Sequence, residues 1–294
     1  IESKLKRFAS FIFVMNKSVV SITHSKDFAD LLSQVSSTID LCKANEILKK
    51  EWKYLVKPNW IIDEHWSRGN ITSTDTVEAI VKYLIKNVGV KPEKIIVGDG
   101  GYPSLTKGCM KTNDVYQLEE LGISVKDMND DQFEVIEPKN PFALKKVNFS
   151  KTALSMDCII SVPSLKTHCL AVTTLSLKNI MGLILPKGIM HSRLHEKIAD
   201  LASIVRKKMH LSIIDGIIGS DGPEEGGDPV EMGLLLASMD SVALDTVGTY
   251  IMGWNEKQAE YLQYAEKKGL GTCNLNNIEV VGKQIKEVAK KFER

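Results

Sequence analysis

The sequence predicts an α/β protein built on an open, mainly parallel sheet with helices on both faces. Short apolar runs rich in β-branched residues alternate along the chain with stretches of helical periodicity. These runs are apolar on both faces, as parallel strands covered from both sides are. A chain of 294 residues, 43% of them hydrophobic, is also long enough to bury one large core.

Each element follows from its local pattern. The apolar runs predict strands over residues 19–23, 54–56, 94–97, 158–162, 211–214 and 234–237. Helical spacing of apolar residues predicts helices over residues 28–41, 76–88 and 241–252. Thr74 or Asp75 is the expected N-cap of the second helix. Helical patterns are also expected directly after the strand that ends at Pro163.

The organisation of the chain is predicted to be one α/β domain over residues 16–294. An irregular section rich in Asp, Asn and Pro, residues 127–150, breaks the even repeat that a closed eight-fold barrel requires. This section is the candidate for an internal boundary or a small inserted subdomain. The chain begins with Ile1, and Met15 is a candidate natural start, so residues 1–15 are expected to be a non-native or disordered extension.

Composition excludes several classes of protein. Lys and Arg number 38 against 37 Asp and Glu, so the basic footprint of a nucleic-acid binder is missing. No uncharged apolar run reaches the length of roughly 20 residues that a membrane span requires. The five cysteines include no C-x-x-C pair, so we expect neither disulfides nor an iron–sulfur cluster in this chain, and a reducing cytoplasm fits best.

The densest polar signal follows the strand predicted over residues 158–162. Lys166 supplies a positive charge, Thr167 and Thr173 supply hydroxyl groups, and an ensuing helix N-terminus would favour an anion. Ligands bind beyond the carboxyl ends of strands in open parallel sheets, and this is such an end. A phosphate or carboxylate would therefore fit here, and the alternative is a solvated loop before an ordinary helix cap.

A second cluster contains His191, Arg193 and His195. The two histidines are four residues apart and can share one helix face, and His168 could complete a divalent metal site. The alternative is that they decorate or cap a helix, since no H-E-x-x-H order is present. Arg193 is a separate candidate for bidentate recognition of a carboxylate or phosphate.

Polar residues also follow several other predicted strands. Asp215 begins a stretch with Gly222 and Gly226, where backbone could approach a ligand closely, although a flexible acidic loop explains it equally well. Because the carboxyl ends of parallel strands share one edge, we expect these groups to converge there. The expected set is Lys57, Asn59, Asp99, Lys166, His168, Asp215 and Asp240.

An ordered set of motifs is similar to one family. K-P-N stands at residues 57–59, D-x-x-I-x-x-P-x-x-K-T-H at 157–168 and L-x-x-K-N-x-x-G at 175–182. G-P-x-x-G follows at 222–226 and A-S-x-D-x-V-A-x-D at 237–245. The chain resembles the domain of unknown function 362 family from about residue 54 to 282. Some members carry a ferredoxin-like domain with iron–sulfur clusters, so the resemblance implies redox work; this chain lacks such cysteines and would need a separate ferredoxin-like partner.

These observations lead to two functional hypotheses. The first is an enzyme that binds a small anionic substrate or cofactor, with His168, Asp215 and Lys166 as catalytic groups. Its predicted ligand-binding residues are Lys57, Asn59, Thr167, Thr173, Lys178, Asn179, Arg193, Gly222 and Gly226. The alternative is a metal- or cofactor-binding redox partner protein that holds a divalent metal through His168, His191 and His195. The sequence names neither the reaction nor the cofactor.

Overall fold

The computed structural model describes residues 17–25, 30–223 and 226–293. The predicted extension over residues 1–15 lies outside these residues, as does the start of the helix predicted over 28–41. A ten-stranded sheet has the order β13-β1-β12-β11-β7-β2-β3-β4, with β8 beside β11 and β9 beside β8. Its strands are β1 (Ser18–His24), β2 (Tyr54–Pro58), β3 (Ile95–Asp99), β4 (Ser124–Asp127), β7 (Cys158–Val162), β8 (Ser164–His168), β9 (Val172–Thr174), β11 (Leu211–Asp221), β12 (Asp228–Ser238) and β13 (Ile278–Gly282).

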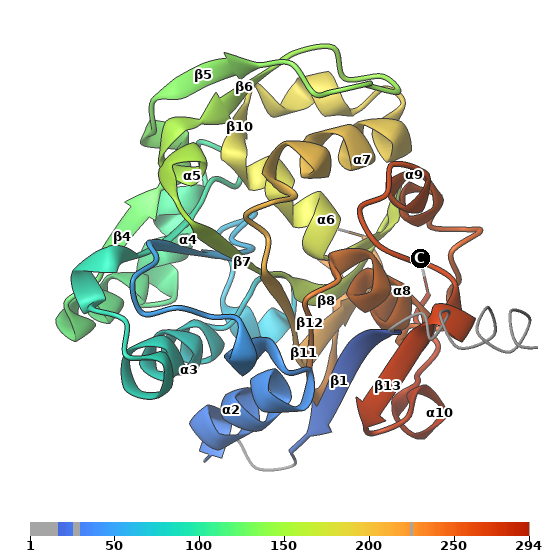
Figure 1. Ribbon diagram of the computed structural model, residues 1–294, viewed down its shortest axis with the longest axis horizontal. Coiled ribbons are helices and arrows are strands. Elements are labelled where there is room, and N and C mark those ends of the chain that lie inside the picture. The colour runs from blue at the N-terminus through green and yellow to red at the C-terminus, as the bar shows by residue number, and fades with distance from the viewer. Residues whose placement is uncertain (1–16, 26–29, 224–225, 294) are drawn as a thin grey trace, which may run out of the picture.

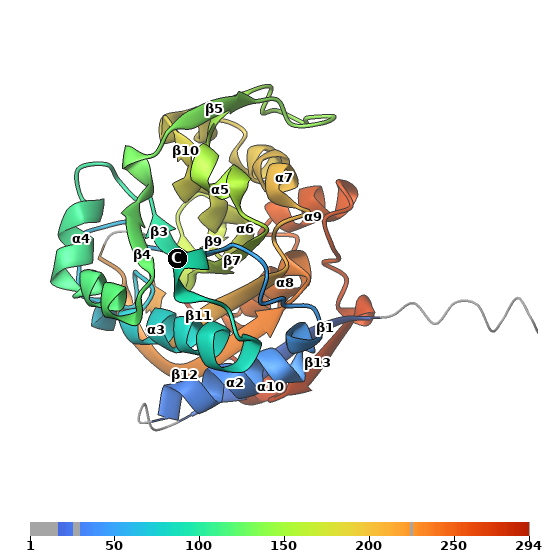
Figure 2. The same ribbon diagram turned by 60° about the vertical axis from the view of Figure 1, so that its left-hand side comes forward.

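Helices cover both faces of this sheet, and most neighbouring strands are parallel, which confirms the predicted α/β class. Figures 1 and 2 show α2 and α3 on one side and α5, α6 and α7 on the other. The helices are α2 (Leu31–Leu41), α3 (Thr74–Tyr83), α4 (Thr106–Thr112), α5 (Lys151–Ser155), α6 (Ser176–Asn179), α7 (Leu194–Val205), α8 (Ser241–Ile251), α9 (Tyr261–Lys267) and α10 (Ile285–Val288). A π-helical turn over Leu84–Val88 extends α3, whose N-cap is Ser73.

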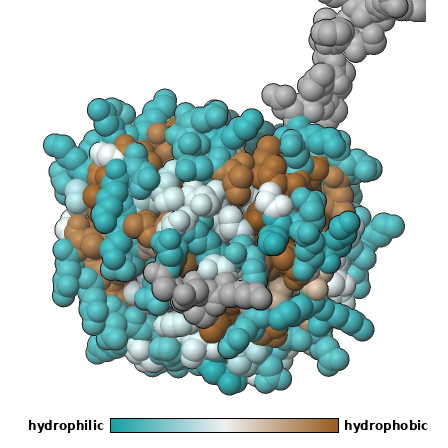
Figure 3. Space-filling view, turned by 90° about the horizontal axis from the view of Figure 1, so that it is seen from below, coloured by the Kyte–Doolittle hydropathy of each residue, from teal (hydrophilic) through white to brown (hydrophobic). Residues whose placement is uncertain are grey.

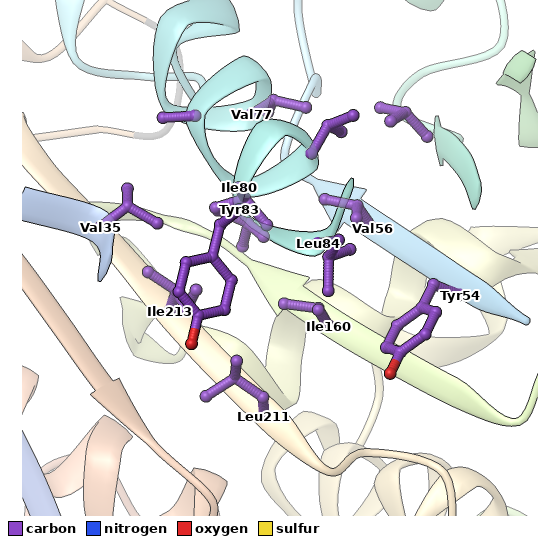
Figure 4. Close-up of a cluster of buried hydrophobic side chains, with 14 of the residues drawn as sticks. Val35, Tyr54, Val56, Val77, Ile80, Tyr83, Leu84, Ile160, Leu211 and Ile213 are labelled. Atoms are coloured by element: carbon purple, nitrogen blue, oxygen red, sulfur yellow. The ribbon is translucent and has the colours of Figure 1, made fainter. Parts of the chain in front are cut away.

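The core under α2 and α3 shows why the apolar runs form central strands. Figure 4 shows side chains of both helices facing side chains of β2, β7 and β11. Val56 of β2 and Ile160 of β7 are fully buried, as is Ile213 of β11. Burying side chains of this size stabilises the fold by roughly 1.5–3 kcal/mol each. Alternate residues of the same strands, such as Leu55 and Ile159, pack against the helices of the opposite face.

A separate three-stranded sheet takes two strands from the irregular section over residues 127–150 and its third strand from residues 184–185. Its order is β10-β6-β5, from β5 (Phe133–Ile136), β6 (Val147–Ser150) and β10 (Ile184–Leu185). The segment between β5 and β6 is fastened by Asp200 of α7, whose carboxylate accepts hydrogen bonds from the N–H groups of Phe142, Ala143 and Leu144. Lys268 donates to the same carboxylate at 2.7 Å.

Two expectations about the chain path were wrong. The residues after Pro163 do not lead directly into a helix: they form β8, which turns back as β9, and α6 begins only at Ser176. The polar side chains of β8 gave it the sequence pattern of a loop. In the structure these side chains are buried, and Lys166 and Thr167 are hydrogen bonded to the backbone of other segments.

The second error concerns β11 and β12. Each was expected to be a short strand followed by a loop and helix, but they are eleven residues long and form an antiparallel hairpin. The stretch from Asp221 to Asp228 connects them. Because β12 runs opposite to its neighbour, Asp240 lies at the other edge of the sheet, where it accepts a hydrogen bond from Ser18 at the start of β1.

The outer surface is mixed in character. Hydrophilic residues cover much of the face seen in Figure 3, with hydrophobic patches between them, as is ordinary for a folded protein. Within residues 17–25, 30–223 and 226–293, no helix is both long and apolar enough to span a bilayer.

Replacing Asp200 by Ala should destabilise the fold by roughly 3–5 kcal/mol, because Lys268 and three backbone N–H groups would lose a buried partner. Urea unfolding measures this change. Burial raises the pKa of Asp200, but the hydrogen bonds from Leu144 and Lys268 outweigh it and leave the pKa below its usual value. The stabilisation is therefore present above about pH 4 and is lost as the pH falls through the folded pKa.

The Glu78–Lys82 pair of α3 provides the control, because its side chains are 41% and 33% exposed. Glu78→Ala should cost less than about 1 kcal/mol. Equal losses for the two variants would contradict the assigned role of Asp200.

Candidate functional site

A cavity of about 290 Å³ opens beyond the carboxyl ends of β2, β3 and β8. The segment from Thr174 to Leu194, which includes α6, completes its wall. The lining residues are Asn59, Ile61, Asp99, Gly100, Tyr102, His168, Cys169, Leu170, Thr174, Lys178, Asn179, Met181, Gly182, Lys187, His191 and Leu194. Three members of the set predicted to converge from the strand ends, Asn59, Asp99 and His168, therefore line one cavity.

A buried ion pair lies beneath the cavity. Lys57 Nζ lies 2.6 Å from Asp99 Oδ1, and both side chains are almost completely buried. The ammonium also donates to Asn179 Oδ1 at 2.9 Å and to the Pro58 carbonyl at 3.0 Å. Burial lowers the pKa of Lys57, and the Asp99 charge opposes this effect. The second oxygen of Asp99 accepts the N–H of Trp60 at 2.7 Å, so the pair joins the ends of β2 and β3.

Two buried oxygen atoms at the cavity lack a hydrogen-bond partner among the described residues. They are Asn59 Oδ1 and Thr174 Oγ1. Asn59 is held in place because its Nδ2 donates to Asn179 Oδ1 and its backbone exchanges hydrogen bonds with Thr72. A buried polar atom without a partner costs about 1–3 kcal/mol. A bound ligand or water in the cavity would remove this cost.

The charged side chains that line the cavity, among the described residues, are two lysines and one aspartate. Lys178 and Lys187 both line it, and Asp99, the acidic side chain among the lining residues that the structure describes, is already paired with Lys57. Lys187 Nζ donates to Asn129 Oδ1 at 2.8 Å. Burial lowers the pKa of Lys187 to about 8, so this ammonium can exchange its proton near neutral pH.

His168 presents a defined tautomer. Its Nδ1 accepts the N–H groups of Leu170 and Ala171, each at 3.0 Å. A nitrogen that accepts two hydrogen bonds carries no proton, so the neutral ring keeps its proton on Nε2. The side chain lines the cavity and is 5% exposed. In this tautomer the Nε2–H of His168 is a hydrogen-bond donor.

Asp245 of α8 fixes the start of α6, which carries Lys178 and Asn179. Its carboxylate accepts the N–H groups of Ser176 and Leu177 at 2.8 and 2.9 Å. Burial raises the pKa of Asp245 to about 7 despite these hydrogen bonds. The last residue of the A-S-x-D-x-V-A-x-D motif thus supports the cavity wall without lining the cavity.

Two of the predicted catalytic residues lie outside the cavity lining. Lys166 Nζ donates to the Asn70 carbonyl at 2.8 Å. Asp215 accepts the N–H groups of Ser73 and Ile217, and burial raises its pKa to about 6. Both side chains fasten the segment before α3. That segment includes Thr72, the partner of Asn59, so their connection to the cavity is indirect.

Several predicted ligand-binding residues also have structural partners elsewhere. Thr167 Oγ1 donates to the Gly222 carbonyl and accepts the Gly222 N–H, which closes the β11–β12 connection. Gly226 lies in the same connection with φ of 84°. Thr173 Oγ1 lies 3.0 Å from the Tyr261 hydroxyl. Lys57, Asn59, Lys178 and Asn179 are the predicted ligand-binding residues that the structure gathers at the cavity.

The three histidines of the predicted metal site do not form one ligand group. His168 and His191 line the cavity, whereas His195 Nδ1 accepts the Tyr261 N–H and its ring stacks on Tyr261. In the described part of the chain, no three His, Cys, Asp or Glu side chains are arranged to hold a metal ion. Arg193 projects from the surface beside Glu196.

Sequence reasoning missed several lining residues, among them Lys187, Tyr102 and Leu170. Lys187 follows Pro186 in a segment without the period of a strand or helix, and its spacing carried no signal of a site. Gly182 was visible as the last residue of the L-x-x-K-N-x-x-G motif. Its role is steric, since a Cβ at this position would lie 2.7 Å from Lys57 Nζ and would collide with Asp99 Oδ1.

Comparisons with known proteins agree with the motifs. The model of the family described as Domain of unknown function (DUF362) matches residues 55–250. The chain is 27% identical over 265 residues to the thylakoid-associated protein sll1697 of Synechocystis sp., covering 85% of this chain and 79% of that protein. The lactate racemase apoprotein of Thermoanaerobacterium thermosaccharolyticum aligns with 12% identity and a TM-score of 0.49, over 81% of this chain and 58% of the racemase chain.

Replacing Gly182 by Ala should destabilise the protein by roughly 1–3 kcal/mol, because the added methyl group meets the buried Lys57–Asp99 pair. Gly188→Ala is the matched control, since a Cβ there meets no atom within 4 Å. The control should change stability by no more than about 1 kcal/mol in either direction. Thermal or urea unfolding of both variants measures the difference, and equal stability would show that the ion pair yields to the methyl group.

Proposed function

The chain belongs to the DUF362 family, and we propose that it is an enzyme that binds a small organic anion in this cavity and exchanges a proton with it. The observation that carries the proposal is the meeting in one cavity of two lysines, a histidine whose Nδ1 accepts two backbone N–H groups, and two unpartnered buried oxygens. Such a combination of a cavity with a few convergent polar groups is typical of ligand sites.

Binding would use the polar end of the cavity. The Lys178 ammonium attracts a carboxylate or phosphate group, and His168 Nε2–H can donate to one of its oxygens. Asn59 Oδ1 and Thr174 Oγ1 would accept hydrogen bonds from a hydroxyl group of the ligand. The Lys57–Asp99 pair holds Asn179 and the ends of β2 and β3, so these groups are in position before the ligand arrives.

Lys187 would act as the acid and base in proton exchange. With a pKa of about 8, it has both a neutral and a protonated population near pH 8. A neutral amine can take a proton from the bound anion and return it in a later step, while His168 stabilises negative charge that develops on an oxygen. This division of roles distinguishes an enzyme from a carrier, which needs no titrating group.

The cysteines support a reducing compartment for this activity. All five are free thiols, and four of them are buried. Because the thiols are free, we propose a reducing environment. We propose no particular cell compartment, because the Synechocystis relative is described as thylakoid-associated.

Lys178→Met should weaken anion binding about 30-fold or more, because loss of a charged partner of a bound anion costs roughly 2–5 kcal/mol. Calorimetry with phosphate, pyrophosphate and small carboxylates measures the affinity. Lys82→Met removes one charge from an exposed pair with Glu78 and is the control, with an expected change of less than twofold. Unchanged binding by a folded Lys178→Met variant would contradict the proposed binding mode.

Proton exchange should depend on Lys187. In D₂O, a bound carboxylate that carries exchangeable C–H groups should gain deuterium, and the rate should rise with pH through about 8 as the amine becomes neutral. NMR measures the incorporation. Lys187→Met should abolish both the exchange and this pH dependence. Anion binding without exchange in any member of the carboxylate panel would favour a binding protein over an enzyme.

A further inference from the structure

The cavity changes character from its floor to its mouth. The floor is polar and buried: Asn59, His168, Thr174, Lys178 and Asn179 are each at most 7% exposed. The mouth is formed by the segments that follow β2, β3 and β8 and by the turn after α6. Its apolar side chains are Ile61, Tyr102, Leu170 and Met181.

Two of these apolar side chains are open to solvent. Leu170 is 53% exposed and Tyr102 is 36% exposed. They stand on different segments, one after β8 and the other after β3, yet both line the same opening. A hydrophilic ligand that occupied only the floor would leave this apolar rim in water and gain nothing from it.

The size of the cavity leads to the same conclusion. A water molecule takes up about 30 Å³, so a volume of about 290 Å³ corresponds to roughly ten groups of that size. Inorganic phosphate, with five heavy atoms, or acetate, with four, would fill at most about half of it. The remaining space adjoins the apolar side chains of the rim, because the buried polar groups lie at the floor; the half-buried Lys187 and the exposed His191 also line the cavity.

We propose that the ligand is an organic anion with an apolar tail of about five to eight carbon atoms, bound with its anionic group at the floor and its tail against Tyr102 and Leu170. This inference rests on the proposed function and adds the class of ligand to it. The anionic group can be a carboxylate or a phosphate, since Lys178 and His168 would bind either. The tail is what separates this ligand class from small hydrophilic anions.

A chain-length series tests the proposal. Calorimetry would compare acetate, butyrate, hexanoate and octanoate, with methyl, butyl and hexyl phosphate as the second series. Each added methylene group that is buried should strengthen binding about fourfold until the rim is filled. The series with the higher affinity at equal tail length identifies the anionic group.

Variants at the rim provide the sharper test. Leu170→Ser should lower the affinity for hexanoate and octanoate several-fold and leave acetate almost unchanged. Leu41→Ser is the matched control, because Leu41 is 42% exposed and lies at the end of α2, away from the cavity. The control should preserve the dependence on chain length.

The outcomes separate this inference from the proposed function. If short anions bind and affinity does not grow with tail length, the tail proposal is wrong and the anion site stands. A chain-length effect that Leu170→Ser leaves intact would place the tail elsewhere and also overturn the inference. If no member of either series binds, both proposals fail.

Discussion

The requirement that dominates this structure is the pairing of a fully buried lysine. Lys57 is the last residue but one of β2, and its ammonium is stable there only because Asp99, Asn179 and a backbone carbonyl surround it. Asp99 comes from β3 and Asn179 from α6, so satisfying one charge fixes three elements. The cost of breaking such a pair, roughly 3–5 kcal/mol, is a large part of the stability of an ordinary domain. The geometry of the cavity follows from that constraint.

Two other buried carboxylates also hold neighbouring segments in place. Asp245 holds the first N–H groups of α6, and Asp215 holds the N–H of Ser73 before α3. Burial raises the pKa of both carboxyl groups because it disfavours their charged form, and the backbone hydrogen bonds partly offset this effect. Asp245 supports the cavity wall directly and Asp215 supports it indirectly, and neither side chain lines the cavity. The groups at the cavity are thus held in place by contacts within the protein itself.

The sequence predicted the central strands, the α/β class and the edge at which polar groups gather, because apolar runs and strand ends are local signals. It failed where polar residues are buried. Lys166 and Thr167 resembled loop residues, yet they belong to β8, which pairs with β9 and β11. Their polar side chains are buried because they bond to the backbone of residues far along the chain, Asn70 and Gly222. Lys187 was missed for the opposite reason: it is brought to the cavity by tertiary packing, which leaves no pattern in its neighbours.

The motifs of the family and the lining of the cavity therefore overlap only in part. In K-T-H, His168 lines the cavity, whereas Lys166 and Thr167 hold other segments together. The apolar rim residues Tyr102 and Leu170 lie outside every motif. Since the motifs describe the frame and the polar floor, a relative can keep all of them while its rim differs. In the ligand mode that we propose for this chain, the groups that meet the anion, Lys178 and His168, lie within the motifs, whereas the residues that meet the tail lie outside them.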